Sequence, residues 1–385
     1  MSTSALFQPI RVGAWTLQHR IVLPGLTRLR SEPDGSPLLP LVPEYYSQRG
    51  STPGTLLISE GTFVVPAMDA FPGLYTEEHA RKWKNVTDAV HAKGSYILLQ
   101  IASAGRVANP AVLAKLNPPV PFTAPSAIAQ PPGPFVFSDE VPREMTKDEI
   151  KEEIELYAKT ARLAIEVGGF DGIELHACNG SLIEQFLKDV SNVREDEYGG
   201  SPERRARFGL EVVEALVKVV GEERLGVRVS PWNADAGLAM KNPEPTYAYF
   251  ASELRTRFPS LAYLHAIEAR VDRGGNDRDD PDATQSIEFL RKIWAGPGRV
   301  FISAGGYNRT TAIERAERSA KEYDGLIDMV AFGRFFIANP DLPLRLKNDL
   351  PLNPYDRSTF YIPGDASGKG YTDYPFYSSD GATTQ

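Results

Sequence analysis

Eight short runs of apolar and β-branched residues recur along the chain and constrain its fold more than any other feature. Runs of this kind are typical of parallel strands that are buried on both faces. The segments between most of them have helical periodicity, so strands alternate with helices. The runs are Arg20–Pro24, Thr55–Ser59, Tyr96–Ile101, Gly172–Leu175, Gly226–Ser230, Ala262–Ile267, Val300–Ala304 and Asp328–Gly333.

Three of the intervening segments carry clear helix signals. Thr146 and Glu149 form a capping box, and apolar residues follow at helical spacing as far as Ile165. A second helix is predicted from about residue 202 to residue 220, because it begins with proline and carries inward-facing apolar residues at helical spacing. Residues 78–92 also have helical spacing of apolar residues and predict a third helix. Eight strands alternating with helices predict an α/β fold, a (β/α)8 TIM barrel. A doubly wound open sheet is the alternative, and the absence of GxGxxG after the first strand weakens it.

The length of 385 residues fits one barrel with insertions, so we expect a single domain over residues 1–385. Residues 104–145 contain nine prolines and are too long for an ordinary connection. We expect them to form a capping excursion after the third strand, over the mouth of the barrel; a plain surface insertion is the alternative. Residues 350–385 show little periodicity and predict an irregular C-terminal tail.

The composition argues against several classes of protein and of site. The net charge is −8 and no basic run is present, which argues against nucleic-acid binding. No apolar stretch is long enough for a membrane helix, and the N-terminus lacks a signal or transit pattern, so we expect a cytoplasmic protein. The single cysteine, Cys178, excludes an intrachain disulfide, and the five histidines lack the HxxxH spacing, so we expect no metal site.

The segment from Gly172 to Leu187 carries the clearest candidate chemistry. It begins as a strand, so His176 and Asn179 emerge at the end that lies at the barrel mouth. These two neutral donors, three residues apart, are suited to polarising one carbonyl oxygen. Cys178 lies between them, and a small buried residue is a better interpretation of it than a redox group.

Four segments follow one another in sequence order: His176–Ser181, Gln185–Leu187, Asn192–Ser201 and Glu203–Phe208. Except at one residue they match the pattern HxxNGY, QFL, NxRxDxYGGS and ExRxRF, and in this they resemble the Old Yellow Enzyme family of NADPH dehydrogenases or ene-reductases. Further similar segments extend the resemblance over residues 1–376, and residues 42–49 are shared with the fungal branch that reduces chanoclavine aldehyde.

The resemblance implies a bound FMN. Thr27, at the end of the first strand, would bond the flavin O4, and Gly61 would let the backbone approach the ring. Gln100 and Arg228 would lie at the pyrimidine side, where a guanidinium stabilises negative charge on the reduced flavin. The other residues assigned to the cofactor are Gly25 and Leu26 beside the ring, Gly305, Gly306, Gly333 and Arg334 at the phosphate, and the flanking aromatic pair Phe360 and Tyr361.

The resemblance also implies an activity, the ping-pong reduction of activated C=C bonds in α,β-unsaturated carbonyl compounds by NADPH. NADPH reduces FMN and leaves, and a small-molecule enone or enal then takes its place. His176 and Asn179 would bind the carbonyl oxygen, with Tyr361 and Ala102 beside the substrate. We expect a monomer or a homodimer.

Ser181 is the one departure within the catalytic pattern, because relatives have a proton-donating tyrosine there. A serine hydroxyl is a far weaker acid than a phenol and has a shorter reach, so Ser181 is a poor proton donor. Three consequences are possible: water protonates the substrate in place of the tyrosine, another pocket tyrosine does so, or protonation fails. We favour water. Slow protonation would instead give a redox-neutral isomerase or a dehydrogenase, or a flavin-binding protein without efficient turnover.

Ala102 is a second departure, because relatives usually have a large aromatic residue at this position. Ala102 and Ser181 are both small where relatives are large. The sequence therefore predicts a roomier pocket and a bulkier substrate.

Overall fold

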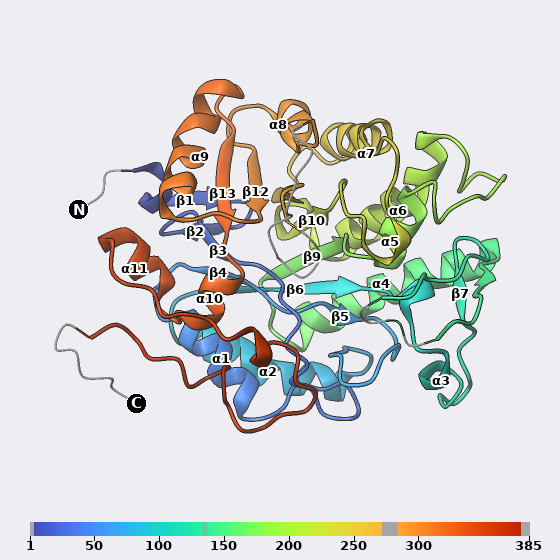
Figure 1. Cartoon of the computed structure of the whole chain (residues 1–385), viewed down its shortest axis with the longest axis horizontal. Coiled ribbons are helices and arrows are strands. Elements are labelled where there is room, and N and C mark those ends of the chain that lie inside the picture. The colour runs from blue at the N-terminus through green and yellow to red at the C-terminus, as the bar shows by residue number, and fades with distance from the viewer. Residues whose placement is uncertain (1–3, 134–135, 137, 272–283, 379–385) are drawn as a thin grey trace.

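The eight predicted strands are present and close into a parallel barrel (Figure 1). The computed structural model describes residues 4–133, 136, 138–271 and 284–378. Going round the barrel, the order is β3, β4, β6, β9, β10, β11, β12 and β13, and β13 pairs with β3 to close it. The predicted TIM barrel is confirmed. The bounds are β3 (Ile21–Leu23), β4 (Leu56–Ile58), β6 (Tyr96–Ala102), β9 (Gly172–Ala177), β10 (Leu225–Val229), β11 (Tyr263–Ile267), β12 (Val300–Ala304) and β13 (Ile327–Ala331).

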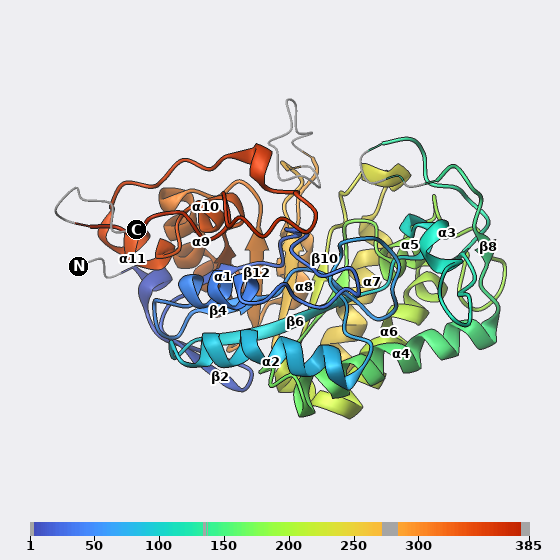
Figure 2. The same ribbon diagram turned by 90° about the horizontal axis from the view of Figure 1, so that it is seen from below.

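The helices surround the barrel, and Figure 2 shows α2, α4 and α6 side by side on the edge opposite the C-terminal tail. The capping box is present, because the Thr146 hydroxyl accepts from the Glu149 N–H at 3.2 Å and Glu149 accepts from the Thr146 N–H at 2.8 Å. The bounds are α1 (Leu41–Arg49), α2 (Glu77–His91), α3 (Pro110–Leu113), α4 (Lys147–Glu166), α5 (Leu182–Leu187), α6 (Pro202–Val220), α7 (Glu244–Arg257), α8 (Glu288–Trp294), α9 (Arg309–Glu322), α10 (Arg334–Ala338) and α11 (Leu342–Asn348). Short 3-10 helices are η1 (Ala5–Phe7), η2 (Gly105–Val107), η3 (Glu222–Arg224), η4 (Asp235–Gly237) and η5 (Arg357–Thr359).

Two apolar cores hold the barrel together. The larger one lies between the strands and the surrounding helices, and the smaller one includes Leu98, Ile302 and Met329 inside the barrel. An antiparallel hairpin of β1 (Ile10–Val12) and β2 (Trp15–Leu17) contributes Trp15 to the inner core. The hairpin therefore plugs the N-terminal end of the barrel and leaves the opposite end for the site.

The proline-rich segment follows β6, the third strand of the barrel in sequence. Its described part contains η2, α3 and the paired strands β7 (Thr123–Ala124) and β8 (Arg143–Glu144). A further short strand, β5 (Thr62–Phe63), pairs with β6. In the described part of the tail beyond residue 350, η5 is the one regular element. Residues 134, 135 and 137 of the excursion and 379–385 of the tail lie outside the described residues.

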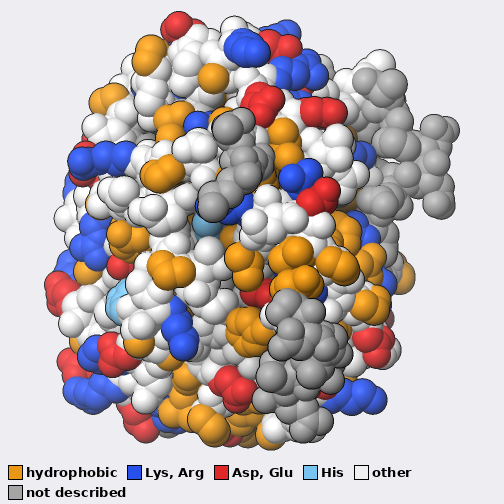
Figure 3. Space-filling model, turned by 90° about the vertical axis from the view of Figure 1, so that its left-hand side faces the viewer, with side chains coloured by type: hydrophobic (Ala, Val, Ile, Leu, Met, Phe, Trp, Pro, Cys, Tyr) orange, Lys and Arg blue, Asp and Glu red, His pale blue; other side chains and the backbone are white. Residues whose placement is uncertain are grey.

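The surface carries charges of both signs. On the face shown in Figure 3, Lys and Arg side chains are mixed with Asp and Glu and with scattered hydrophobic groups. Among the described residues, no helix combines the length and the apolar character that crossing a membrane requires.

Replacing Gly172 with alanine should destabilise the plugged end of the barrel. The new Cβ would lie 2.5 Å from the backbone oxygen of Arg224 and 2.7 Å from the Trp15 ring. Overpacking of this kind costs about 1–3 kcal/mol, so the thermal unfolding midpoint should fall. Gly133→Ala is the matched control, because a Cβ there meets nothing within 4 Å. Equal midpoints for the two variants would contradict the packing described here.

Candidate active site

A cavity of about 1120 Å³ opens at the C-terminal ends of the barrel strands. Ordinary small-molecule pockets are roughly 300–1,000 Å³, so this cavity has room for a cofactor and a substrate together. Residues 130–133 of the excursion and Phe360 and Tyr361 of the tail complete its wall. Every residue assigned to the site from the sequence lines this one cavity: Gly25, Leu26, Thr27, Gly61, Gln100, Ala102, His176, Asn179, Ser181, Arg228, Gly305, Gly306, Gly333, Arg334, Phe360 and Tyr361. Their individual roles stay predictions.

The turn after β9 is held in place by a carboxylate that the sequence analysis missed. Asn179 has a left-handed backbone with φ of 52°, and its N–H donates to the Ser230 hydroxyl at 3.1 Å. Buried Glu184 of α5 accepts from that hydroxyl at 2.6 Å and from the Gly180 N–H at 2.5 Å. Glu184 therefore fixes the turn on which the candidate donors sit. In the sequence, the signal for Glu184 was its position directly before the QFL segment that begins at Gln185.

The Ser181 hydroxyl is directed at the main chain. It donates to the backbone oxygen of His176 at 2.7 Å, and the Ser181 side chain is buried. The Cys178 thiol is also buried and lies 3.2 Å from His176 Nδ1. The Ser181 proton is thus engaged in a hydrogen bond to the protein.

Gln100 and Arg228, near the C-terminal ends of β6 and β10, form the floor of the cavity. Arg228 donates from Nη1 to the backbone oxygen of Gly25 at 3.1 Å. Its Nε is buried, and no hydrogen-bond partner for it exists among the described residues. A Cβ on Gly25 would lie 2.5 Å from the Gln100 amide, so a larger residue at this position would displace the amide.

Glu174 lies beneath this floor and was also missed from the sequence. Its Oε1 accepts from Gln100 Nε2 at 2.6 Å, and its Oε2 accepts from the Tyr263 hydroxyl at 3.0 Å and faces His265 Nδ1 at 2.8 Å. Burial by itself would raise the pKa of Glu174, but His265, Arg228 and the Gln100 hydrogen bond together lower it to about 2. The carboxyl is therefore ionised at neutral pH. The available signal was its position two residues before the candidate histidine, on the same face of the strand.

The glycines assigned to the phosphate lie where β12 and β13 end. Gly305 and Gly306 have φ of 115° and 63°, in the region that favours glycine. Gly333 precedes α10, and a Cβ there would lie 3.2 Å from the Leu26 side chain. Arg334 donates to the Tyr355 hydroxyl at 3.3 Å. Backbone groups and a guanidinium thus meet at one end of the cavity, as a phosphate would require.

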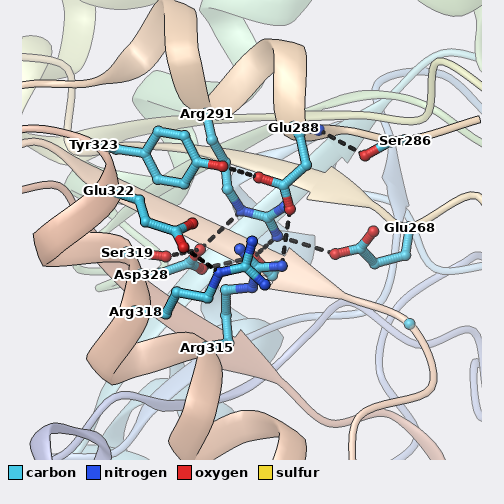
Figure 4. A network of polar contacts seen from close by, with 12 residues as sticks. Glu268, Ser286, Glu288, Arg291, Arg315, Arg318, Ser319, Glu322, Tyr323 and Asp328 are labelled. Atoms are coloured by element: carbon cyan, nitrogen blue, oxygen red, sulfur yellow. Dashed lines mark hydrogen bonds and ion pairs between the residues drawn. The ribbon is translucent and has the colours of Figure 1, made fainter.

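Figure 4 shows an ion-pair network around Arg291, and Tyr307 joins the first of these loops to it. Arg291 of α8 is buried and contacts Asp328 at 2.9 Å and Glu268 at 3.0 Å. The Tyr307 hydroxyl, next to the glycine pair, donates to Glu268 at 2.6 Å. Arg270 donates from Nε and Nη2 to the backbone oxygen of Gly305 at 3.0 and 2.7 Å. None of these supporting residues was predicted from the sequence.

The aromatic pair of the tail is brought to the cavity by a buried arginine. Arg28 donates to the backbone oxygens of Phe360 at 3.1 Å and Gly370 at 2.7 Å. Phe360 is buried, whereas Tyr361 is 40% exposed, and the two rings are nearly perpendicular with centroids 6.3 Å apart. Tyr361 is therefore placed at the entrance rather than deep in the cavity.

The cavity fits an FMN in its chemistry. The floor offers the Gln100 amide and the buried Nε of Arg228, for which the described part of the chain supplies no partner, and both suit a polar ring edge. The far end offers Arg334 and glycine backbone, which suit a phosphate. The part of the cavity between the floor and the far end is lined partly by Leu26 and Ala331, which suit an aromatic ring system.

Comparison with known proteins gives a consistent result. The sequence profile of the NADH:flavin oxidoreductase / NADH oxidase family matches residues 5–353. The chain is 43% identical to a chanoclavine-I aldehyde reductase of Penicillium roqueforti, covering 96% of each chain. It is 41% identical to an NADP-dependent oxidoreductase of Aspergillus flavus, covering 97% and 96%, and 40% identical to a probable inactive reductase of Epichloe festucae, covering 98% and 96%.

Solved structures agree. An Old Yellow Enzyme from Pichia sp. AKU4542 superposes with a TM-score of 0.85 at 34% identity, over 98% of this chain and 95% of that one. Morphinone reductase in complex with tetrahydroNAD superposes with a TM-score of 0.83 at 37% identity, over 99% of each chain. The chain is thus similar to an Old Yellow Enzyme over nearly its whole length, and it belongs to the NADH:flavin oxidoreductase / NADH oxidase family of FMN-dependent, nicotinamide-using oxidoreductases.

Proposed function

We propose that the chain reduces the activated C=C bond of α,β-unsaturated carbonyl compounds with NADPH by a ping-pong mechanism. The observation that carries this proposal is the placement of His176 and Asn179 on the wall of the cavity whose floor is Gln100 and Arg228. The similarity to an NADP-dependent oxidoreductase supports NADPH as the reductant.

The chain's own residues would act on the carbonyl oxygen and on the cofactor. FMN, when bound, supplies the hydride chemistry between the nicotinamide and the β carbon of the substrate. His176 and Asn179 donate hydrogen bonds to the carbonyl oxygen and stabilise the negative charge that develops there. Gln100 and Arg228 hold the pyrimidine edge of the flavin, and Arg334 holds the phosphate.

Ser181 does not provide the proton in this mechanism. Its hydroxyl is bonded to the backbone oxygen of His176, and an aliphatic hydroxyl is a weak acid. Tyr307 also lines the cavity, but its hydroxyl is bonded to Glu268, and burial raises its pKa. Tyr355 and Tyr361 also line the cavity, so another pocket tyrosine is the alternative proton donor. We favour water that enters the cavity as the source of the proton.

The substrate is an enone or enal of some bulk, because Ala102 and Ser181 leave space on the wall. The similarity to a chanoclavine-I aldehyde reductase supports an unsaturated aldehyde. The cytoplasmic location and the choice between monomer and homodimer stay predictions from the sequence.

Two alternatives follow from the missing tyrosine. Slow protonation would make the chain a redox-neutral isomerase or a dehydrogenase. A flavin-binding protein without efficient turnover is favoured by a different observation, the 40% identity to a probable inactive reductase.

Anaerobic reduction of the yellow holoprotein distinguishes these functions. NADPH should bleach the flavin colour, and a subsequent enone or enal should restore it with formation of the saturated product. Bleaching without recovery would support the binding protein. Conversion of the substrate to an isomer without net consumption of NADPH would support the isomerase.

Replacing Ser181 with tyrosine should accelerate enone reduction, because a phenol can deliver the proton directly. General acid catalysis contributes roughly 10²–10⁴-fold, so an increase of at least about tenfold in the rate of flavin reoxidation is expected in stopped-flow experiments. Ser181→Phe is the matched control, since it has nearly the same size but no hydroxyl. If the tyrosine variant is no faster than the wild type, the proton-donor argument is wrong.

Replacing Arg334 with alanine should weaken FMN binding but leave riboflavin binding unchanged. Hydrogen bonds to charged groups contribute about 1.5–3 kcal/mol, which corresponds to a loss of about ten- to a hundredfold in FMN affinity. Titration of the apoprotein with each flavin, followed by quenching of flavin fluorescence, measures both constants. Equal losses for FMN and riboflavin would place the phosphate elsewhere.

A further inference from the structure

A fully buried carboxylate, Glu174, lies inside a barrel that is otherwise filled largely with apolar side chains. An ion removed from water costs several kcal/mol unless hydrogen bonds and opposite charge offset the loss. Glu174 receives hydrogen bonds from Gln100 and Tyr263 and faces His265. Two of the groups around it, Gln100 and Arg228, line the cavity, so this costly charge is coupled to the cavity floor.

We propose that Glu174 is a positioning residue that orients the Gln100 amide, offsets the charge of Arg228, and thereby sets the reduction potential of the bound flavin. This inference rests on the proposed placement of FMN over Gln100 and Arg228. It concerns a residue that does not line the cavity and acts through the two that do.

The orientation of Gln100 follows from what a carboxylate can do. An ionised carboxylate only accepts hydrogen bonds, so the amide nitrogen of Gln100 must be the atom that faces Glu174. The amide oxygen then points away from it, and a Cβ on Gly61, another cavity residue, would lie 3.3 Å from that oxygen. Gln100 therefore presents an acceptor to the cavity, which matches the imide N–H at the pyrimidine edge of a flavin.

The charge of Glu174 acts in the opposite direction to that of Arg228. Reduction adds negative charge to the flavin, and a nearby guanidinium favours it. A buried carboxylate behind the guanidinium weakens this effect, and the low dielectric of the barrel interior transmits both charges strongly. His265 adds no charge of its own at neutral pH, because burial lowers its pKa despite the facing carboxylate. Arg228 and Glu174 are thus opposed charges behind the flavin edge.

The isosteric variant Glu174→Gln tests this assignment. Removal of the negative charge leaves Arg228 unopposed, so the bound flavin should become easier to reduce. We expect at least a tenfold increase in the equilibrium constant for reduction, which is about 30 mV for a two-electron couple, in a spectroelectrochemical titration of the holoprotein.

Asp328→Asn is the matched control for the loss of a buried carboxylate. Asp328 is fully buried in β13 and is bonded to Ser303 at 2.6 Å and Ser319 at 3.0 Å, within the network behind the loop assigned to the phosphate, and it has no hydrogen bond to Gln100 or Arg228 among the described residues. Its loss should lower the unfolding midpoint without moving the flavin potential. A Glu174→Gln variant that behaves like Asp328→Asn, less stable but with the wild-type potential, would overturn the proposal.

A second variant covers the case in which Glu174→Gln fails to fold. Tyr263→Phe removes one hydrogen bond to the carboxylate, and Tyr263 is not among the described residues that line the cavity. The less stabilised negative charge should make the flavin harder to reduce, a shift opposite in sign to that of Glu174→Gln. An unchanged potential in a folded Tyr263→Phe protein would also contradict the proposal.

The proposed function and this inference fail in distinguishable ways. If the wild type binds FMN and reduces an enone while the potentials of the variants do not move, the role of Glu174 alone is wrong. If the wild type binds no FMN, the cofactor placement on which both depend is wrong.

Discussion

The pairing of β13 with β3 is the interaction on which the site depends, because it closes the sheet. Val330 and Ala331 pair with Ile21 and Val22, residues that lie some three hundred positions away in the chain. In a closed parallel barrel all C-terminal strand ends meet at one rim. Thr27 after the first strand and Arg334 after the last can therefore line the same cavity.

Inside the closed barrel, the polarity of the side chains increases from the N-terminal end towards the cavity. At the N-terminal end, Trp15 and other apolar side chains fill the barrel and exclude water. Next comes the polar layer with Glu174 and Arg228, and then the cavity. The polar layer depends on the plug. The neighbours of Glu174 lower the pKa of its carboxyl to about 2, and they can do so only where solvent does not screen their charges and hydrogen bonds.

The sequence was sufficient for those parts that local patterns determine. The strands appear as apolar runs, α6 spans residues 202–220 as expected, and α4 begins at the Thr146 capping box. The residues taken from the family resemblance also gather in one cavity, because most of them lie in the C-terminal part of a barrel strand or just after it. Phe360 and Tyr361 of the tail reach the same cavity through the contact of Arg28 with the Phe360 backbone. Glu174 and Glu184 were missed because most of their partners come from distant parts of the chain, and their positions close to recognised residues do not show what they contact.

Ser181 shows how a local substitution acquires meaning only in three dimensions. From the sequence it is a short, weakly acidic group where relatives have a phenol. In the fold its hydroxyl donates to the backbone oxygen of His176, so it helps to shape the turn that carries the proposed carbonyl-binding pair. With Glu184 fixing Gly180 in the same turn, the donors remain in place although the proton donor is gone. In the proposed mechanism this turn keeps carbonyl binding but no longer supplies the proton, so the rate of protonation decides between reduction and redox-neutral rearrangement.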